Sequence, residues 1–324
     1  MNALPWQPSE KPLMLAPMQG LTNEALRQCF IERYCPDILF TEFVRVNSQS
    51  RKRIAKADLA EIKAHREATP LVVQLIGNAP AALADAAQRV QTVGCGYLNL
   101  NLGCPYGRMT TGATGGELLK NPLALAGLLA ELRAVITGSF SVKCRAGYDD
   151  PRQLFDLLPV FADSGVDFLI LHPRTVVQKY AGVADHELTA EAVQRTALPV
   201  IANGDICTAG QARLLLQQAG VAGVMLGRGA LADPLLFKRI RGQEPDCVDE
   251  GQRRLELYAF IADLLPRYLI KFCGERQALM KLKDVLNFIP DPLLQRDLGK
   301  LKRAVTVERF NALLSERFLA PAGI

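Results

Sequence analysis

The chain has 324 residues, of which 49% are hydrophobic and 22% are charged, a composition typical of a folded globular protein and not of a disordered one. It has no run of about 20 apolar residues, so a membrane span is not expected, and residues 1–12 lack the apolar segment of a secretory signal. The net charge is +5, and residues 266–324, with 11 Lys/Arg and 6 Asp/Glu, account for all of it. This asymmetry favours a polyanionic partner, although a solvated helical surface explains it about equally well.

The eight cysteines show no CxxC spacing and no nearby histidine pair. That pattern argues against a zinc site. Apolar neighbours around most of them are typical of reduced thiols in a cytoplasmic protein. We therefore expect no metal site and a cytoplasmic location.

Short apolar runs alternate with amphipathic stretches from residue 13 to about residue 240. The predicted strands are Leu13–Pro17, Ile38–Phe43, Leu71–Gly77, Tyr97–Leu102, Phe140–Arg145, Asp167–His172, Pro199–Asn203 and Gly223–Gly227. The predicted helices between them are Glu24–Arg33, Ala81–Val93, Leu123–Val135, Arg152–Asp163 and Gln211–Gln218. Eight such units in about 230 residues predict an α/β fold, a (β/α)8 TIM barrel. A doubly wound sheet is disfavoured because no GxGxxG follows the first strand.

Beyond Pro245 the pattern is helical only. The predicted helices are Arg253–Leu265, Glu275–Phe288 and Asp297–Leu314, with breaks at Pro266, Pro290 and Pro292. We therefore expect a catalytic barrel in residues 1–245 and a small all-helical domain in residues 246–324.

Polar residues stand at nearly every predicted strand end, where a barrel of this kind carries its chemistry. Packing explains one such residue easily, but hardly a whole ring of them, so an active site is the better interpretation. They include Glu42, Gln74, Asn99, Asn101, Lys143, Arg145, His172 and Asn203.

The last two strand ends are rich in glycine. Asn203-Gly204-Asp205 follows the seventh strand and Gly227-Arg228-Gly229 the eighth. Glycine lets backbone N–H groups approach a phosphate, and Arg228 adds charge-assisted hydrogen bonds. The pattern favours a phosphate-bearing ligand such as an organic cofactor, and the alternative is two tight turns that need glycine.

Cys104 lies in Gly103-Cys104-Pro105, directly after the fourth strand and before the Gly/Thr-rich residues 106–116. A thiol on such a loop above a polar barrel mouth can act as a general acid, and the loop as a lid. The alternative is an inert core cysteine. Lys143, Arg145 and His172 fit donors to an electron-rich ring and a substrate carbonyl, or else structural ion pairs.

These motifs, taken together and in order, resemble those of the bacterial tRNA-dihydrouridine synthases. Thr41-Glu42-Phe43-Val44-Arg45-Val46 is most similar to the DusC-type subfamily, which modifies position 16. The motifs are Ala16-Pro17-Met18, Thr41-Glu42-Phe43, Gln74-Leu75, Asn101-Leu102-Gly103-Cys104-Pro105, Val142-Lys143-Cys144-Arg145, His172-Pro173-Arg174-Thr175, Asn203-Gly204-Asp205 and Gly227-Arg228-Gly229.

The resemblance implies an oxidoreductase that reduces the C5–C6 double bond of a D-loop uridine in tRNA, with bound FMN and with NADPH as the reductant. Cys104 would protonate C5 of a uridine flipped out of the stack. The implied cofactor residues are Ala16, Pro17 and Met18 along the flavin, Gln74, Lys143 and His172 at its ring, and Asn203, Gly204, Asp205, Gly227 and Arg228 at its phosphate. Asn101 and Arg145 would face the substrate, and Arg45, Tyr180, Lys281 and Lys283 would contact tRNA. We expect a monomer whose basic C-terminal part holds the tRNA backbone.

Three other functions remain open. A flavin barrel acting on a free pyrimidine explains the barrel mouth and Cys104 equally well, but leaves the basic helical part unexplained. A non-catalytic tRNA-binding barrel is the second. A phosphosugar isomerase is disfavoured, since no paired carboxylate base stands at the mouth.

Overall fold

The computed structural model describes residues 4–106 and 114–319. In that part of the chain a nine-stranded parallel sheet has the order β2-β1-β9-β8-β7-β6-β5-β4-β3, and pairing of β2 with β4 closes eight strands into a barrel. The ninth, β3, pairs with the end of β4. The strands are β1 (Leu13–Leu15), β2 (Ile38–Phe40), β3 (Val44–Arg45), β4 (Leu71–Ile76), β5 (Tyr97–Leu102), β6 (Ser139–Arg145), β7 (Phe168–His172), β8 (Val200–Asn203) and β9 (Gly223–Leu226).

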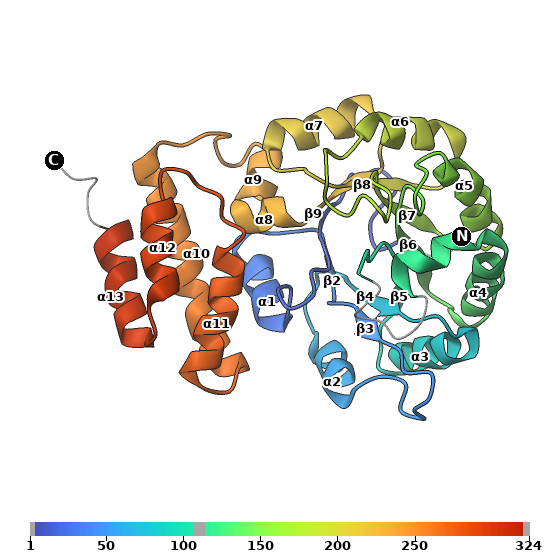
Figure 1. Cartoon of the computed structure of the whole chain (residues 1–324), viewed down its shortest axis with the longest axis horizontal. Helices are drawn as coiled ribbons and strands as arrows, with labels where there is room; N and C mark the ends of the chain where they lie inside the picture. The colour runs from blue at the N-terminus through green and yellow to red at the C-terminus, as the bar shows by residue number, and fades with distance from the viewer. Residues whose placement is uncertain (1–3, 107–113, 320–324) are drawn as a thin grey trace. The chain divides into compact units, whose positions relative to one another are not determined.

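Helices follow the strands, and a helical region follows the barrel, so the predicted fold class is confirmed (Figure 1). The helices of the barrel region are α1 (Glu24–Arg33), α2 (Lys56–Ala64), α3 (Pro80–Thr92), α4 (Pro122–Val135), α5 (Gln153–Asp163), α6 (His186–Arg195) and α7 (Ala209–Gln218), with the 3-10 helix Gly115–Lys120 before α4. After β9 come α8 (Arg228–Ala232), α9 (Leu236–Ile240), α10 (Glu250–Lys271), α11 (Gly274–Leu286), α12 (Gln295–Arg303) and α13 (Val307–Phe318).

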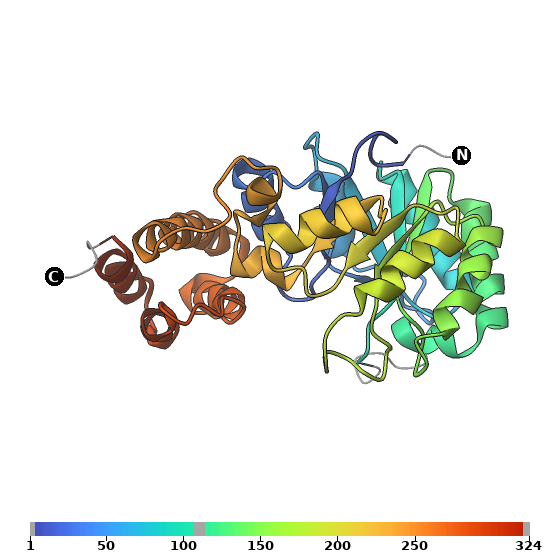
Figure 2. The ribbon, with the colours of Figure 1, turned by 90° about the horizontal axis from the view of Figure 1, so that it is seen from above.

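Two apolar clusters show which way each strand residue faces. Leu169 and Leu171 belong to a cluster that also contains apolar residues of α3–α6, so this cluster is the layer outside the barrel. Phe168 and Ile170 alternate with them and belong to a second cluster, which fills the interior. Figures 1 and 2 show α3–α6 around the strands. The period of two therefore aims alternate residues of each strand into the barrel.

Two helix boundaries in the C-terminal region differ from the prediction. Pro266 lies inside α10 and does not end it. The apolar stripe of α10 continues past Pro266, which is itself exposed. Proline has no N–H to bond the carbonyl one helical turn earlier, and water can bond that carbonyl instead. The expected single helix over 297–314 is two helices, because Thr306 caps α13 by accepting a hydrogen bond from Arg309 N at 3.2 Å.

The tertiary contacts divide the chain into two compact units. Unit 1 comprises 1–18, 36–206 and 212–227, and unit 2 comprises 19–35, 207–211 and 228–324. Helix α1 therefore belongs with the C-terminal helices, although the sequence places it between two barrel strands. The functional division expected between residues 245 and 246 stays a prediction.

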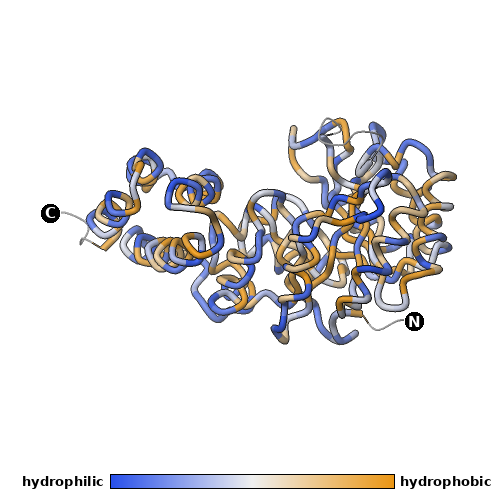
Figure 3. The backbone as a smooth tube through the Cα atoms, turned by 90° about the horizontal axis from the view of Figure 1, so that it is seen from below, coloured by the Kyte–Doolittle hydropathy of each residue, from blue (hydrophilic) through white to orange (hydrophobic). Residues whose placement is uncertain are grey.

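Unit 2 is built on amphipathic helices whose hydrophobic and hydrophilic residues alternate (Figure 3). Each helix from α10 to α13 packs against the next one in the sequence. Helix α10 also contacts α13 and α1. The Phe260 ring lies 6.1 Å from that of Phe30 and 5.8 Å from that of Tyr34, centroid to centroid. These aromatic contacts join α1 to the long helix α10.

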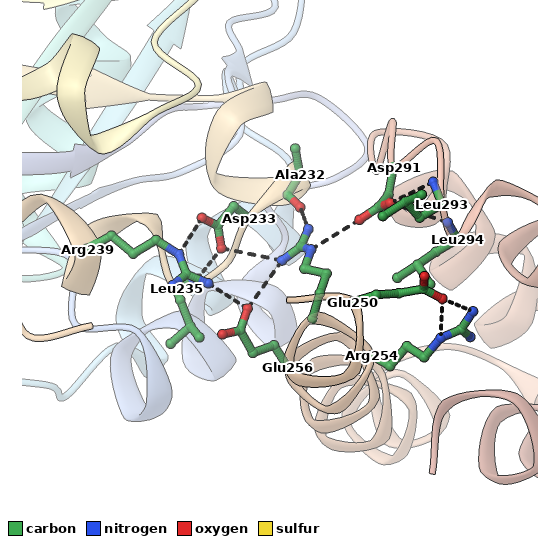
Figure 4. Close-up of polar contacts among 11 residues, drawn as sticks. Ala232, Asp233, Leu235, Arg239, Glu250, Arg254, Glu256, Asp291, Leu293 and Leu294 are labelled. Carbon is green, nitrogen blue, oxygen red and sulfur yellow. Dashed lines mark hydrogen bonds and ion pairs between the residues drawn. The ribbon is translucent and has the colours of Figure 1, made fainter. Parts of the chain in front are cut away.

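Unit 2 also contains a buried ionic network around the start of α10 (Figure 4). Arg239 Nε lies 2.8 Å from Asp233 Oδ2, and Arg239 Nη2 lies 2.5 Å from Glu256 Oε2. Only 4% of the Arg239 side chain and 5% of the Glu256 side chain are exposed. Arg253 extends the network to Asp291. Removing one member would leave another buried charge uncompensated, which is costly.

No helix in the described ranges is both long and apolar enough to cross a membrane.

Candidate active site

A line of amide side chains crosses the inner face of the barrel near the strand ends. Gln74 on β4 donates from Nε2 to Asn99 Oδ1 at 2.7 Å, and Asn99 on β5 donates from Nδ2 to Ser141 Oγ on β6 at 2.8 Å. Asn101 Nδ2 in turn donates to Gln74 Oε1 at 2.8 Å. We call Gln74, Asn99, Asn101 and Ser141 the amide ladder. Its members lie together because β4, β5 and β6 pair in parallel, with Gln74 opposite Asn99 and Asn99 opposite Ser141.

The amide ladder ends on the loop that carries Cys104. Asn101 Oδ1 accepts hydrogen bonds from Gly103 N at 3.1 Å and Cys104 N at 3.0 Å. Because both donors are backbone N–H groups, the orientation of the Asn101 amide is fixed, and that of Gln74 and Asn99 follows from it. On the other side, a Cβ on Gly115 would lie 3.0 Å from Cys104 Cβ, so this close approach needs glycine. Cys104 is thus half-buried in a fixed loop; the rest of the expected lid, residues 107–113, lies outside the described residues.

Two basic side chains of the same wall have polar atoms that no described residue satisfies. Burial, and the neighbouring Arg145 charge, lower the pKa of Lys143 to about 8, and Lys143 has no hydrogen-bond or ion-pair partner among the described residues. Burial, with the Lys143 charge second, lowers the pKa of His172 to about 2, so its imidazole is neutral. His172 Nδ1 is buried without a hydrogen-bond partner in the described part of the chain. A ligand with acceptor atoms would satisfy both groups.

Arg145 lies on the inner face of β6 but is bonded to backbone. Its Nε donates to Gly103 O at 2.9 Å and its Nη1 to Thr175 O at 2.9 Å, with Lys179 O as a further acceptor. The guanidinium carbon also lies 5.3 Å from the centroid of the Tyr180 ring. Arg145, which the sequence analysis assigns to the substrate, therefore ties the Cys104 loop to the segment after β7.

The turn after β8 is packed tightly against His172. Gly204 has a φ of +118°, and a Cβ there would lie 2.9 Å from His172 Cδ2. Asp205, which follows it with a φ of +49°, forms a two-pronged ion pair with Arg174. Asn203 donates from Nδ2 to Met225 O on β9 at 2.9 Å. Asn203 and Asp205, both expected at a phosphate, thus have structural bonds through their side chains.

The turn after β9 lies in close contact with the end of β1. A Cβ on Gly227 would lie 3.5 Å from Ala16 Cβ and 3.6 Å from Met18 Sδ. Ala16 is buried and donates its N–H to Leu226 O at 2.8 Å, whereas Pro17 and Met18 are half-buried. The predicted residues at the ends of β1 and β9 are therefore neighbours.

The residues expected to contact tRNA lie in different surroundings. Arg45 on β3 is exposed and stacks at 5.3 Å on the ring of Phe43, and 48% of Tyr180 is exposed. Lys281 forms an ion pair of 3.7 Å with Asp284 and lies 3.8 Å from the position of a Cβ on Gly20. Lys283, by contrast, donates to the Ala304 carbonyl at the end of α12. Arg228, which is expected at the cofactor phosphate and not at tRNA, is the first residue of α8.

Sequence reasoning gave no role to Arg174 or Ser141, which both belong to this site. Arg174 is one of the largest fully buried side chains of the chain, and Ser141 is fully buried as well. The signal for Ser141 was its place two residues before Lys143 on one strand, since alternate residues share a face. The signal for Arg174 was a charged residue directly after a buried strand end.

Among the described residues, no group of three or more His, Cys, Asp or Glu side chains could hold a metal ion. The side chains described above are amides, the Lys143 ammonium, the neutral His172 imidazole and one thiol, and hydrogen-bonding groups of this kind suit an electron-rich organic ring.

Comparisons with solved structures show barrels of the same kind. Morphinone reductase in complex with tetrahydroNAD superimposes with a TM-score of 0.54 at 14% identity, over 74% of this chain and 89% of that one. The old yellow enzyme homologue from Zymomonas mobilis gives a TM-score of 0.55 at 13% identity, over 75% of this chain and 91% of that one. At such low identity the similarity shows the fold alone.

Comparisons of sequence show the family. The tRNA-dihydrouridine(16) synthase of Cupriavidus necator is 36% identical over 236 residues, covering 71% of this chain and 73% of its own. The tRNA-dihydrouridine(16) synthase of Aquipseudomonas alcaligenes is 32% identical over 270 residues, which cover 79% of this chain and 86% of that protein. The family described as "Dihydrouridine synthase (Dus)" matches residues 14–299. The resemblance noted in the motifs is confirmed, and the chain belongs to the dihydrouridine synthase family of flavin-dependent oxidoreductases.

Proposed function

We propose that this protein is a tRNA-dihydrouridine synthase that binds FMN, takes its electrons from NADPH and reduces the C5–C6 double bond of a D-loop uridine. The names of the relatives from Cupriavidus necator, Aquipseudomonas alcaligenes and Salmonella typhimurium, the last 34% identical over 241 residues, favour position 16. A tRNA substrate also accounts for the basic C-terminal part. Eight free thiols agree with the reducing cytoplasm where tRNA is found.

The observation that carries the proposal is the pair of unsatisfied groups in the barrel wall. Lys143 and His172 present an ammonium and an imidazole nitrogen that lack partners among the described residues. The pyrimidine edge of a flavin offers carbonyl oxygens and ring nitrogens that accept hydrogen bonds, so the donors fit the cofactor. Gly227, Ala16 and Met18, which the resemblance also assigns to the cofactor, are neighbours at the ends of β9 and β1. These residues would hold FMN at the strand ends.

The other expected cofactor residues divide into two groups. Gln74 is fully buried and already bonded to Asn99 and Asn101, so it supports the wall from within the amide ladder. The backbone of Asn203-Gly204-Asp205 and of Gly227 would supply N–H groups for the phosphate. The role of Arg228 at the phosphate stays a prediction from the resemblance.

When bound, FMN would supply hydride chemistry for the reduction at C6 of the uracil ring. The chain itself supplies the proton: we assign it to the Cys104 thiol, which Asn101 holds in place through two backbone hydrogen bonds. A positioned acid avoids the loss of orientation that a mobile thiol would suffer. The Lys143 ammonium favours negative charge that develops on the reacting ring.

The uridine must leave the base stack to reach this wall, since stacked bases hide their faces. Exposed Tyr180 and Arg45 offer an aromatic ring and a cation at the strand-end side of unit 1, as RNA recognition requires. In unit 2 we keep Lys281 as a phosphate contact. We propose that a monomer is sufficient for these tasks.

The test is the Cys104→Ala variant, with Cys247→Ala as the matched control because Cys247 is an exposed cysteine outside the barrel strands and their turns. We expect purified protein to contain FMN and to form dihydrouridine in unmodified tRNA with NADPH. Cys104→Ala should keep FMN and tRNA binding but lose at least about 100-fold in turnover, the typical contribution of a general acid. Wild-type turnover in Cys104→Ala contradicts the proton-donor assignment. Equal turnover on free uridine would instead favour a free-pyrimidine reductase.

A further inference from the structure

We propose that Arg174 and Asp205 form a positioning pair that holds residues 173–185, the segment presenting Tyr180, in the shape needed for the RNA substrate. The Asp205 side chain would then serve the tRNA step, and only its backbone N–H would remain available to the cofactor phosphate. The inference rests on the proposed function, and it concerns side chains that lie entirely within unit 1. We refer to residues 173–185 as the 173–185 loop.

Arg174 is bonded to this loop from the inside. Its Nε donates to Ala181 O at 3.1 Å and its Nη2 to Gly182 O at 2.6 Å, while its own backbone N–H donates to His172 O at 2.8 Å. Only 2% of Arg174 is exposed. A guanidinium has five fixed donors, so these bonds set the distance between the start of the loop and its far side.

Asp205 completes the clamp from the neighbouring strand end. Its two carboxylate oxygens lie 3.1 Å and 2.5 Å from Arg174 Nη1 and Nη2, and Oδ2 also accepts the Ala184 N–H at 2.9 Å. Both carboxylate oxygens are thus bonded to the loop. A carboxylate would also repel a phosphate dianion, so at Asp205 only the backbone N–H suits a phosphate.

The backbone at Asp205 is strained, which supports a specific role. Its φ of +49° lies in the left-handed region, where Asp and Asn are the tolerated non-glycine residues. The left-handed turn is what aims the carboxylate at Arg174, and the two-pronged ion pair offsets the strain. Asp205→Asn keeps both the shape and the left-handed preference but removes the charge.

A second arginine fixes the middle of the same loop. Arg145 Nη1 donates to Thr175 O and Lys179 O, and its guanidinium lies beneath Tyr180 at 5.3 Å. Three apolar or aromatic residues of this loop are exposed: 58% of Val177, 48% of Tyr180 and 82% of Val183 are accessible. Loops of this kind bind bases by stacking, which works only when the ring is held still.

The experiment compares Asp205→Asn and Arg174→Lys with Asp149→Asn, an exposed aspartate in the loop after β6. Each holoenzyme is reduced by NADPH without tRNA, and reoxidation is then followed with unmodified tRNA. Binding of FMN and of riboflavin to the flavin-free protein is measured as a ratio. Trypsin cleavage after Lys179, an exposed residue of the loop, is followed by mass spectrometry.

We expect both variants to reoxidise with tRNA at least about 10-fold more slowly, a loss of about 1.4 kcal/mol in transition-state stabilisation. Reduction by NADPH and the preference for FMN over riboflavin should stay within about twofold of wild type, while cleavage after Lys179 becomes at least about 10-fold faster. Asp149→Asn should match wild type throughout.

Three results would overturn the inference: a lower preference for FMN in Asp205→Asn, equal slowing of both half-reactions, or unchanged cleavage after Lys179 in both variants. Failure of wild-type enzyme to reoxidise with tRNA would refute the proposed function instead. The trypsin and FMN/riboflavin measurements need no tRNA, so they still decide whether the pair holds the loop.

Discussion

Replacing Asn101 with alanine removes three hydrogen bonds at once. Asn101 Oδ1 accepts two of them, from Gly103 N and Cys104 N, and Asn101 Nδ2 donates the third to Gln74 Oε1. Gln74 is fully buried, so its oxygen finds no water, and such an unmade bond costs about 1–3 kcal/mol. The two loop N–H groups are only half-buried, so water replaces the lost acceptor there at a cost of about 1 kcal/mol for both. The free energy of unfolding should therefore fall by about 2–4 kcal/mol.

Urea unfolding of the flavin-free protein, followed by circular dichroism, measures this loss. Alkylation of Cys104 by iodoacetamide, followed by mass spectrometry, reports whether its loop is released, and we expect a rate change of at least about threefold. The matched control is Asn121→Ala, which removes an asparagine that caps α4 through one bond to Ala124 N of 3.0 Å. Asn121→Ala should lower the free energy of unfolding by about 1 kcal/mol and leave the alkylation rate of Cys104 unchanged. A loss in Asn101→Ala no larger than in the control, or unchanged alkylation, refutes the reasoning about the amide ladder.

Two further outcomes follow from the site. Gly204→Ala, with a φ of +118° and a Cβ 2.9 Å from His172, should lower the free energy of urea unfolding by about 2–5 kcal/mol. Gly182→Ala, with a φ of +65° and open space around its Cβ, should cost only about 1–2 kcal/mol, and equal losses would contradict the packing argument. Because the pKa of Lys143 is lowered from 10.5 to about 8, the unfolded state binds the extra proton between these values, so this residue raises stability as pH increases through that window. Urea unfolding of flavin-free wild type and Lys143→Met from pH 7 to 10.5 should show that rise in wild type alone, and parallel curves would contradict it.

The sequence predicted the barrel well because its signal is local. Strands such as Tyr97–Leu102 and helices such as Glu24–Arg33 coincide with the structure, since a buried parallel strand and an amphipathic helix each have a period that a short window shows. The sequence also predicted the strand ends, and Gln74, Lys143 and His172 do lie together on the inner face of neighbouring strands. Pro266 misled the helix prediction because its effect depends on which face of α10 it occupies, and packing decides that.

Side-chain partners could not be predicted in the same way. Asp205 binds Arg174, 31 positions away, and Lys283 binds the Ala304 carbonyl. Both bonds depend on distances that arise only after the elements pack, and no spacing along the chain encodes them. The motifs place a residue at the correct strand end but leave open whether its side chain faces a ligand or a neighbouring turn.

The ionic network at the start of α10 has a practical consequence. Phosphate contacts made by exposed lysines weaken steeply as salt concentration rises, because counterions compete for the RNA backbone. Arg239 and Glu256, almost inaccessible to solvent, are screened far less by the same ions. Under the proposed function, we therefore expect concentrated salt to release bound tRNA from this protein while the ionic network at the start of α10 stays intact.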